Sequence, residues 1–222
     1  MNCDLGEGTG NDEALLPFID RANICCGAHA GSIAETLALA RRCVELGIEI
    51  GAHPGYPDRP GFGRRELGLS ADEIENLVRS QLRVFAGTLR PSYIKPHGAL
   101  YHRCQVDLEL AARMAAIALE LNMGLMGLPD RALMAAAAKA GVAFVREGFV
   151  DRGYRDDGSL IPREEAGSVL SPDAASHQAL ALSWSGRFDS LGIHGDSPDS
   201  VETARSTRLA LQRTGMARSV GQ

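Results

Sequence analysis

Four of the six histidines in this 222-residue chain share a local pattern that favours chemistry. His29, His53, His97 and His194 each follow a short apolar run and lie among glycine or proline residues, where a strand would end in a sharp turn. A neutral imidazole can transfer a proton near neutral pH and can also bind a metal ion. One such histidine is more often structural, but four in equivalent positions predict a catalytic cluster.

The remaining histidines, His102 and His177, lie in polar helical or pre-helical stretches, and we expect both on the surface. Carboxylates accompany the four clustered histidines. Acids beside imidazoles push each other's pKa values apart, which lets one site hold both an acid and a base. We therefore assign catalytic roles also to Asp4, Glu147, Asp151 and Asp196. For Asp196, which directly precedes Ser197-Pro198, capping of the following helix is an equally open role.

Cationic residues at the ends of the same segments indicate anion binding. Lys95 ends a strand that should be buried, so it needs an anionic partner, either a protein carboxylate or a ligand group. Arg64 belongs to the glycine-rich loop 61–65, and Arg152 follows Asp151. We predict that substrate or its anionic groups contact Glu7, Arg64, Lys95 and Arg152.

Seven short strands are predicted, at residues 2–5, 22–26, 48–51, 93–94, 124–128, 142–147 and 190–193. Most of them are separated by predicted helices. Capping boxes at Ser32 and Ser70 open two of these helices, and further helices are expected at 107–121, 130–140 (capped by Asp130), 173–185 and 197–213.

This alternation of strands and helices predicts parallel strands joined by right-handed crossovers. The loops that follow the strands then emerge at one face, where such folds bind ligands. Six of the seven strands carry a candidate residue at that end. An open sheet would spread these residues along a line, so we predict a closed parallel β/α barrel, in a single domain spanning residues 1–222.

Composition excludes several classes of function. The net charge is −5 and the cations are scattered, which argues against a nucleic-acid surface. No apolar run approaches the roughly 20 residues that span a bilayer, and no secretory leader is recognisable at the start. The five cysteines are odd in number and lack zinc-ribbon spacing, so we expect buried free thiols in a cytoplasmic protein.

Taken together, the motifs resemble the LamB/YcsF lactam-utilisation family over the whole chain. The resemblance rests on residues 2–8 (NCDLGEG), 22–27 (ANICCG), 51–58 (GAHPGYPD), 61–65 (GFGRR), 95–101 (KPHGALY), 151–154 (DRGY) and 194–196 (HGD). It implies a barrel of the glycoside hydrolase/deacetylase type. It also implies the A subunit of an ATP-dependent 5-oxoprolinase, which works with subunits B and C. This enzyme opens 5-oxo-L-proline to L-glutamate and converts ATP to ADP and phosphate. We expect Mg²⁺ to accompany the ATP.

Two residues depart from the family's usual Cys-Gly-Phe-His-Ala-Gly-Asp motif. Ala28 replaces the aromatic residue and Ser32 replaces the acid. Ser32 can still cap a helix but cannot offer a carboxylate to a ligand. The glycine-rich loop 6–10 lacks the Lys-Ser/Thr ending of a P-loop, so the chain does not indicate which subunit binds ATP.

Within this hypothesis, Lys95 and Arg152 bind anions, one of His53, His97 and Asp4 transfers protons, and no residue is assigned to a metal. Two alternatives stay open. The first is a metal-dependent amide hydrolase or deacetylase with Asp4, His29 and His53 as ligands. The second is a non-catalytic subunit that binds the substrate inside a larger complex.

Overall fold

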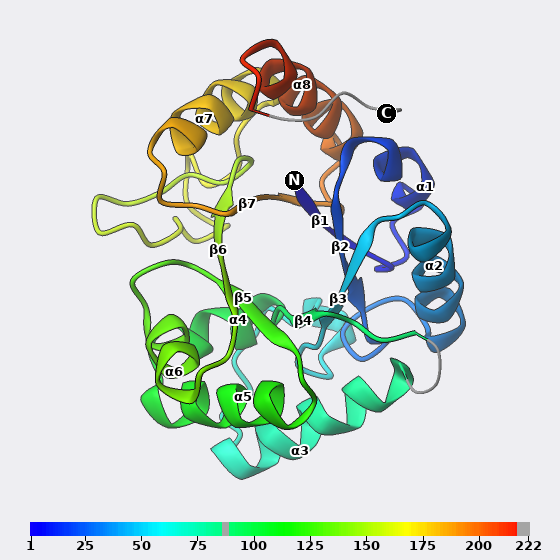
Figure 1. Ribbon diagram of the computed structural model, residues 1–222, viewed down its shortest axis with the longest axis vertical. Helices are drawn as coiled ribbons and strands as arrows, with labels where there is room; N and C mark the ends of the chain where they lie inside the picture. Colours follow the sequence, from blue (N-terminus) through cyan, green and yellow to red (C-terminus); the bar gives the residue numbers. More distant parts are fainter. Residues whose placement is uncertain (86–88, 217–222) are drawn as a thin grey trace.

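Seven parallel strands close into a barrel in the order in which they occur along the chain (Figure 1). This computed structural model describes residues 1–85 and 89–216; residues 86–88 and 217–222 of the predicted domain lie outside the described part. The strands are β1 (Asn2–Leu5), β2 (Arg21–Cys25), β3 (Glu49–His53), β4 (Tyr93–Ile94), β5 (Gly124–Gly127), β6 (Phe144–Phe149) and β7 (Ser190–His194). Because β1 pairs with both β2 and β7, the predicted closed barrel is confirmed.

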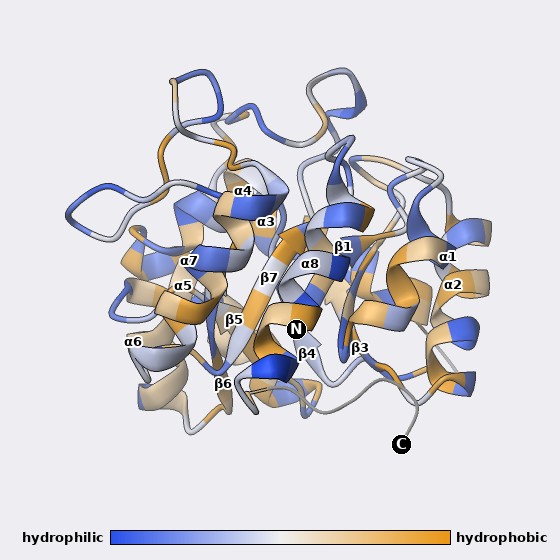
Figure 2. Ribbon diagram, turned by 90° about the horizontal axis from the view of Figure 1, so that it is seen from above, coloured by the Kyte–Doolittle hydropathy of each residue, from blue (hydrophilic) through white to orange (hydrophobic). Residues whose placement is uncertain are grey.

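Helices surround the barrel on the outside (Figure 1). They are α1 (Asp12–Leu15), α2 (Ile33–Glu45), α3 (Ala71–Leu82), α4 (Gly98–Cys104), α5 (Leu108–Glu120), α6 (Ala132–Ala140), α7 (Pro172–Trp184) and α8 (Ser200–Arg213), with 3-10 turns η1 (Leu16–Phe18), η2 (Arg59–Gly61) and η3 (Arg83–Phe85). Long loops extend beyond one end of the barrel (Figure 2). Within residues 1–85 and 89–216, every helix is too short or too polar to cross a membrane.

The helix starts show which capping signals were read correctly. Ser70 forms the predicted capping box with Glu73, whereas Ser32 forms only half of the predicted box, in which its side chain accepts a hydrogen bond from the Glu35 backbone N–H. Asp107 caps α5 in the same way. Each cap satisfies a backbone N–H that the first helical turn leaves without a partner.

Two other predicted starts are wrong. Asp130 has a left-handed backbone (φ 60°), whereas capping needs an extended one, and α6 instead begins after Arg131 without a side-chain cap. The segment Ser197-Pro198 forms a turn before α8, whose cap position is Asp199. The short helices α1 and α4 were not anticipated.

The apolar core lies between the barrel and the helices. Alternate strand residues such as Leu5, Ile24, Ile94 and Ile193 point outward and are fully buried in this layer. The five cysteines are free and buried, as predicted, and burial raises the pKa of the Cys25 thiol to about 12. The interior of the barrel is therefore left to the other, polar set of strand residues.

A hydrogen-bonded polar layer fills the lower part of the barrel. The Tyr93 hydroxyl donates to Asn23 Oδ1 at 2.7 Å, and the Asn23 amide donates to Asp4 Oδ1 at 2.7 Å and to Asn2 Oδ1 at 2.8 Å. Gly51 makes room for this layer, because a Cβ atom there would overlap the Tyr93 ring. The layer is joined to Asp4 through the amide of Asn23.

Candidate active site

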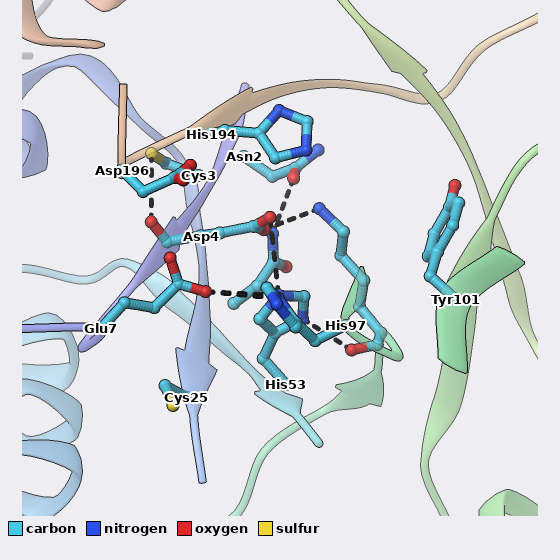
Figure 3. A network of polar contacts seen from close by, with 12 residues as sticks. Asn2, Cys3, Asp4, Glu7, Cys25, His53, His97, Tyr101, His194 and Asp196 are labelled. Atoms are coloured by element: carbon cyan, nitrogen blue, oxygen red, sulfur yellow. Dashed lines mark hydrogen bonds and ion pairs between the residues drawn. The ribbon is translucent and has the colours of Figure 1, made fainter. Parts of the chain in front are cut away.

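The residues singled out from the sequence gather at the carboxyl end of the barrel. Asp4, Glu7, His53 and His97 turn toward one another there, and His194 lies on a further side (Figure 3). The strand register accounts for this arrangement, since Asp4 on β1 is directly paired with His194 on β7. The predicted convergence of the strand-end loops is thus present.

Lys95 is the centre of a buried charge cluster. Its Nζ lies 2.7 Å from Asp4 Oδ1 and 2.7 Å from Glu147 Oε1, so the anionic partners it requires are two protein carboxylates. Burial opposes ionisation of Asp4, but the Lys95 ammonium and His53 outweigh it and hold the pKa of Asp4 well below its usual range. Burial keeps the pKa of Glu147 raised despite Lys95. The two acids are therefore tuned in opposite directions.

Two aromatic residues that the sequence analysis missed enclose this cluster. The Tyr101 hydroxyl donates to Glu147 Oε2 at 3.2 Å, and Lys95 Nζ lies 4.9 Å from the centre of the Phe149 ring. The positions of both residues in the sequence could have placed them at this site. Tyr101 lies on the helix that starts directly after the Lys95 turn, and Phe149 points to the same side of β6 as Glu147.

Three histidines and one glutamate form a second cluster beside it. His29 Nε2 and His97 Nδ1 lie 3.2 Å and 3.3 Å from Glu7 Oε1, and His53 Nε2 lies 3.0 Å from His97 Nδ1. The His29 and His97 rings are stacked, with centroids 3.7 Å apart. Glu7 is enclosed by these imidazoles, and its contact with substrate stays a prediction.

Burial and neighbouring charges disfavour the charged forms of His29, His97 and Glu7. Burial and the nearby His53 lower the pKa of His29 to about 3, and burial together with His29 and His53 holds the pKa of His97 well below its usual range. Burial and the adjacent Asp4 and Asp196 carboxylates raise the pKa of Glu7. At neutral pH, His29 and His97 therefore offer lone pairs rather than positive charges.

Gly63 lies close against the stacked rings of His29 and His97. Its backbone is left-handed (φ +67°), and a Cβ atom there would lie 2.8 Å from His29 Cβ and 2.9 Å from His97 Cδ2. The glycine in the 61–65 loop is thus required by geometry at this point. The loop approaches the histidines as closely as its backbone permits.

Asp151 and His194 form a separate pair on the other side of the cavity. His194 Nδ1 lies 3.0 Å from Asp151 Oδ2, and the His194 backbone N–H donates to the same oxygen at 2.9 Å. Burial opposes ionisation of Asp151, but His194 outweighs it and lowers the pKa of the carboxyl group. The His194 ring also stacks on Phe149, which constrains its position, while the Asp151 carboxylate at Nδ1 favours the tautomer with its hydrogen on that atom.

Asp196 is held by two arginines. Arg64 donates to Asp196 Oδ2 at 2.6 Å, and Arg163 Nη2 lies 3.6 Å from Asp196 Oδ1. The alternative role of Asp196 as a helix cap is wrong, since Asp199 occupies the cap position of α8. Arg163 was not predicted, although it lies in the long polar loop after β6, and unusually long loops often carry function.

Arg152 is buried and bound to its own loop. Its guanidinium donates to the Ser168 and Ile161 carbonyls at 2.8 Å and 2.6 Å. Burial and the neighbouring Arg163 lower the pKa of Arg152 to about 10. Arg152 therefore both shapes the loop and adds positive charge, and its role in anion binding stays a prediction.

One cavity of about 300 Å³ is lined by part of this set, whereas Glu7, His29, Glu147, Asp151 and Asp196 are not among its lining residues. Its wall includes Asp4, Arg64, Lys95, Arg152, Arg163 and His194. His102, expected on the surface, is exposed but also lines this cavity, whereas His177 is exposed on α7. A small polar molecule that carries an anionic group fits this combination of charge and size.

Comparison with known proteins connects this geometry to one family. The model of the LamB/YcsF family matches residues 1–220. The chain belongs to the LamB/YcsF family. The A subunit of 5-oxoprolinase from Methylococcus capsulatus is 40% identical and covers 97% of this chain and 93% of the relative. The A subunit from Nocardia farcinica is also 40% identical, and covers 97% and 96%.

The fold agrees with a solved member. The crystal structure of a lactam utilization protein from Thermus thermophilus superposes with a TM-score of 0.83 at 34% identity, covering 97% of this chain and 96% of the other. In this LamB/YcsF chain, Ser32 caps α2 as predicted, and the neighbouring Ala28 is half-buried.

Proposed function

We propose that this chain is the A subunit of an ATP-dependent 5-oxoprolinase, which opens the lactam ring of 5-oxo-L-proline to L-glutamate. ATP, accompanied by Mg²⁺, is converted to ADP and phosphate, and the chain acts in the cytoplasm with subunits B and C. The observation that carries the proposal is the cavity at the barrel end, whose lining combines arginines with the buried Asp4, His53 and His97. The relatives that bear the name of the 5-oxoprolinase A subunit support it.

The positive side of the cavity suits the anionic groups of the reactants. The substrate carries a carboxylate, and phosphoryl transfer would add a second anion. Arg64, Arg152 and Arg163 supply charge that these anions can pair with. Because the Lys95 ammonium is shared by two protein carboxylates, its main role in this proposal is to fix Asp4 and Glu147 rather than to hold the substrate alone.

The chemistry requires activation of a stable amide. Transfer of the terminal phosphoryl group of ATP to the lactam oxygen releases ADP and makes the ring carbon electrophilic. Water then adds to that carbon, the C–N bond breaks with protonation of nitrogen, and an acyl phosphate remains. A second water hydrolyses the acyl phosphate to L-glutamate and phosphate. Each water attack needs a base, and the departing nitrogen needs an acid.

The pair formed by His194 and Asp151 suits this proton transfer. Asp151 contacts His194 Nδ1 and fixes the ring, as an orienting carboxylate does for a catalytic imidazole. Asp4, held ionised by Lys95, lies on the same cavity wall and is the second candidate base. His53 and His97 also line the cavity, with His53 Nε2 3.5 Å from Asp4 Oδ2.

Reconstitution tests the proposal. The purified chain is mixed with candidate B and C subunits, and ADP and L-glutamate release are measured with and without 5-oxo-L-proline. We expect turnover to require all three proteins and to fall by at least about 100-fold in His194→Ala, within the range for loss of general acid–base catalysis. His177→Ala, at an exposed histidine of α7, is the matched control.

Full turnover by the B and C subunits alone would contradict the proposal. Ring opening by this chain without ATP would favour an amide hydrolase instead.

A further inference from the structure

Backbone carbonyls fix the tautomers of two adjacent histidines. His53 Nδ1 lies 2.7 Å from the Lys95 carbonyl oxygen, and His97 Nε2 lies 2.7 Å from the Phe62 carbonyl oxygen. A carbonyl oxygen can only accept, so each of these nitrogens carries the hydrogen. In a neutral ring the other nitrogen then has a lone pair, which leaves His53 Nε2 and His97 Nδ1 as acceptors.

These two acceptor atoms face each other at 3.0 Å, with a third acceptor beside them. Glu7 Oε1 lies 3.3 Å from His97 Nδ1 and 3.9 Å from His53 Nε2. Atoms that only accept hydrogen bonds cannot satisfy one another. A single proton could bridge two of them, whereas a metal ion would satisfy all three. Ligands about 2.0–2.1 Å from a tetrahedral Zn²⁺ are about 3.3 Å apart, close to the spacing of this set.

We propose that Glu7, His53 and His97 form a binding site for a divalent transition-metal ion, with His29 holding the Glu7 carboxylate in place. Each histidine ligand has the carbonyl partner that typically orients metal-binding imidazoles. Two imidazoles and one carboxylate favour zinc or another first-row transition metal over the magnesium that accompanies a nucleotide. All three side chains are buried, so the ion would be held away from bulk water.

His29 belongs to the site but is better suited to an outer position. The ligand atoms of all four residues lie within 4.8 Å of one another. However, the His29 and His97 rings are parallel to within 3° at a centroid distance of 3.7 Å, so their in-plane lone pairs cannot both point at one ion. His29 Nε2 lies 3.2 Å from Glu7 Oε1, where a ring N–H can donate to the carboxylate.

The site opens toward the cavity. His53 and His97 line the cavity wall together with Asp4, whose Oδ2 lies 3.5 Å from His53 Nε2. An ion held there would have its remaining coordination position directed at the cavity, the arrangement that distinguishes catalytic from structural metal sites. Such an ion could polarise a carbonyl group or acidify a bound water molecule. This inference does not rest on the proposed ATP-dependent reaction.

Metal binding by the isolated chain tests the inference directly. After dialysis against a chelator, the chain is titrated with Zn²⁺ alone by calorimetry, and with Co²⁺ while the visible absorption spectrum is recorded. We expect one equivalent of each ion to bind, with Co²⁺ bands typical of low coordination number. His53→Ala and His97→Ala should each weaken Zn²⁺ binding by more than about 100-fold, because loss of an outer partner alone typically costs about 10- to 100-fold.

Two further variants and one control complete the experiment. Glu7→Gln keeps the size of the side chain and should also weaken Zn²⁺ binding by more than about 100-fold, whereas His29→Ala should cost about 10- to 100-fold. His177→Ala, at an exposed histidine far along the chain, should bind Zn²⁺ like the wild type. Thermal unfolding of each variant shows whether it is folded.

Absence of stoichiometric Zn²⁺ binding to the folded wild type would overturn the inference. Wild-type affinity for Zn²⁺ in folded His53→Ala and Glu7→Gln would also overturn it. A loss in His29→Ala as large as in His53→Ala would overturn the outer position of His29. No nucleotide, lactam or second subunit is present, so this outcome is independent of the reconstitution.

Discussion

Lys95 Nζ lies 2.7 Å from Glu147 Oε1, in a place where both side chains are almost completely buried. The same ammonium group lies 2.7 Å from Asp4 Oδ1. One cation thus compensates two carboxylates inside the barrel. Burial of the Asp4 and Glu147 carboxylates depends on Lys95, because a buried carboxylate without a partner is strongly disfavoured.

Replacement of Lys95 by methionine should therefore destabilise the protein by about 3–5 kcal/mol, the range for breaking a buried ion pair from one side. Methionine has a similar length, so the loss reflects the charge rather than a cavity. The free energy of unfolding is measured in urea. Arg187→Met removes a cation from an exposed pair with Asp130 and should have little effect. Equal effects of the two substitutions would contradict the role assigned to Lys95.

Gly63 gives a prediction that concerns the stacked histidines. In Gly63→Ala, two effects should destabilise the protein. The new methyl group would overlap His29 and His97, and an alanine in a left-handed conformation costs about 1–2 kcal/mol. Gly68 has nearly the same backbone angle (φ +65°) but open space around it, so Gly68→Ala isolates the backbone cost. We expect Gly63→Ala to be the more destabilising of the two in urea unfolding. Identical losses of stability would show that the rings do not depend on this contact.

The pair of Asp151 and His194 should produce a recognisable dependence of stability on pH. The pKa of Asp151 is lowered in the folded protein, so ionised Asp151 stabilises the fold above its unfolded pKa of about 3.9, and this contribution is lost as the pH falls through the folded-state pKa. Asp151→Asn cannot titrate. The difference in free energy of unfolding between wild type and variant should therefore be constant above about pH 5 and shrink below about pH 4. If this difference in free energy of unfolding grew as the pH falls, the predicted direction would be contradicted. Asp173→Asn, at an exposed site, controls for the removal of a negative charge.

Arg163 should contribute to the binding of anionic substrate. Hydrogen bonds to charged groups are worth about 1.5–3 kcal/mol, so Arg163→Gln should weaken substrate binding by about 10- to 100-fold. The dissociation constant for 5-oxo-L-proline is measured by calorimetry on the chain alone, or KM on the reconstituted enzyme. Arg155→Gln, which removes an exposed cation of the same loop paired with Glu165, is the matched control. If both variants bind alike, Arg163 only supports Asp196.

The barrel could be predicted because strand and helix signals alternate along the whole chain, and the six strand ends that carry polar residues require a common face. The failures have local causes. Asp130 has the right residue type for a helix cap, but its backbone angle depends on the loop and not on its own side chain. Asn23 and Tyr93 were overlooked, although their alternation with outward-facing apolar residues on the same strands marks them as interior.

The pairing of residues across the site was beyond sequence reasoning. That Lys95 would meet both Asp4 and Glu147 depends on the register of β1, β4 and β6 around a closed barrel. The facing nitrogens of His53 and His97 likewise depend on which ring atom each backbone carbonyl selects. Residue types identify the participants, whereas the three-dimensional register decides their partners.

The pairing of β1 with β7 also has a consequence for how the protein forms. Asp4 gains its neighbour His194 through contacts between residues almost 200 positions apart, so closure of the barrel requires nearly the whole described chain. Contacts of such long sequence separation form slowly, because a large loop must be closed before they contribute. During synthesis, β1 cannot pair with β7 until nearly the whole chain has been made. The acid, the base and the cavity between them should therefore appear together, as the final event of folding.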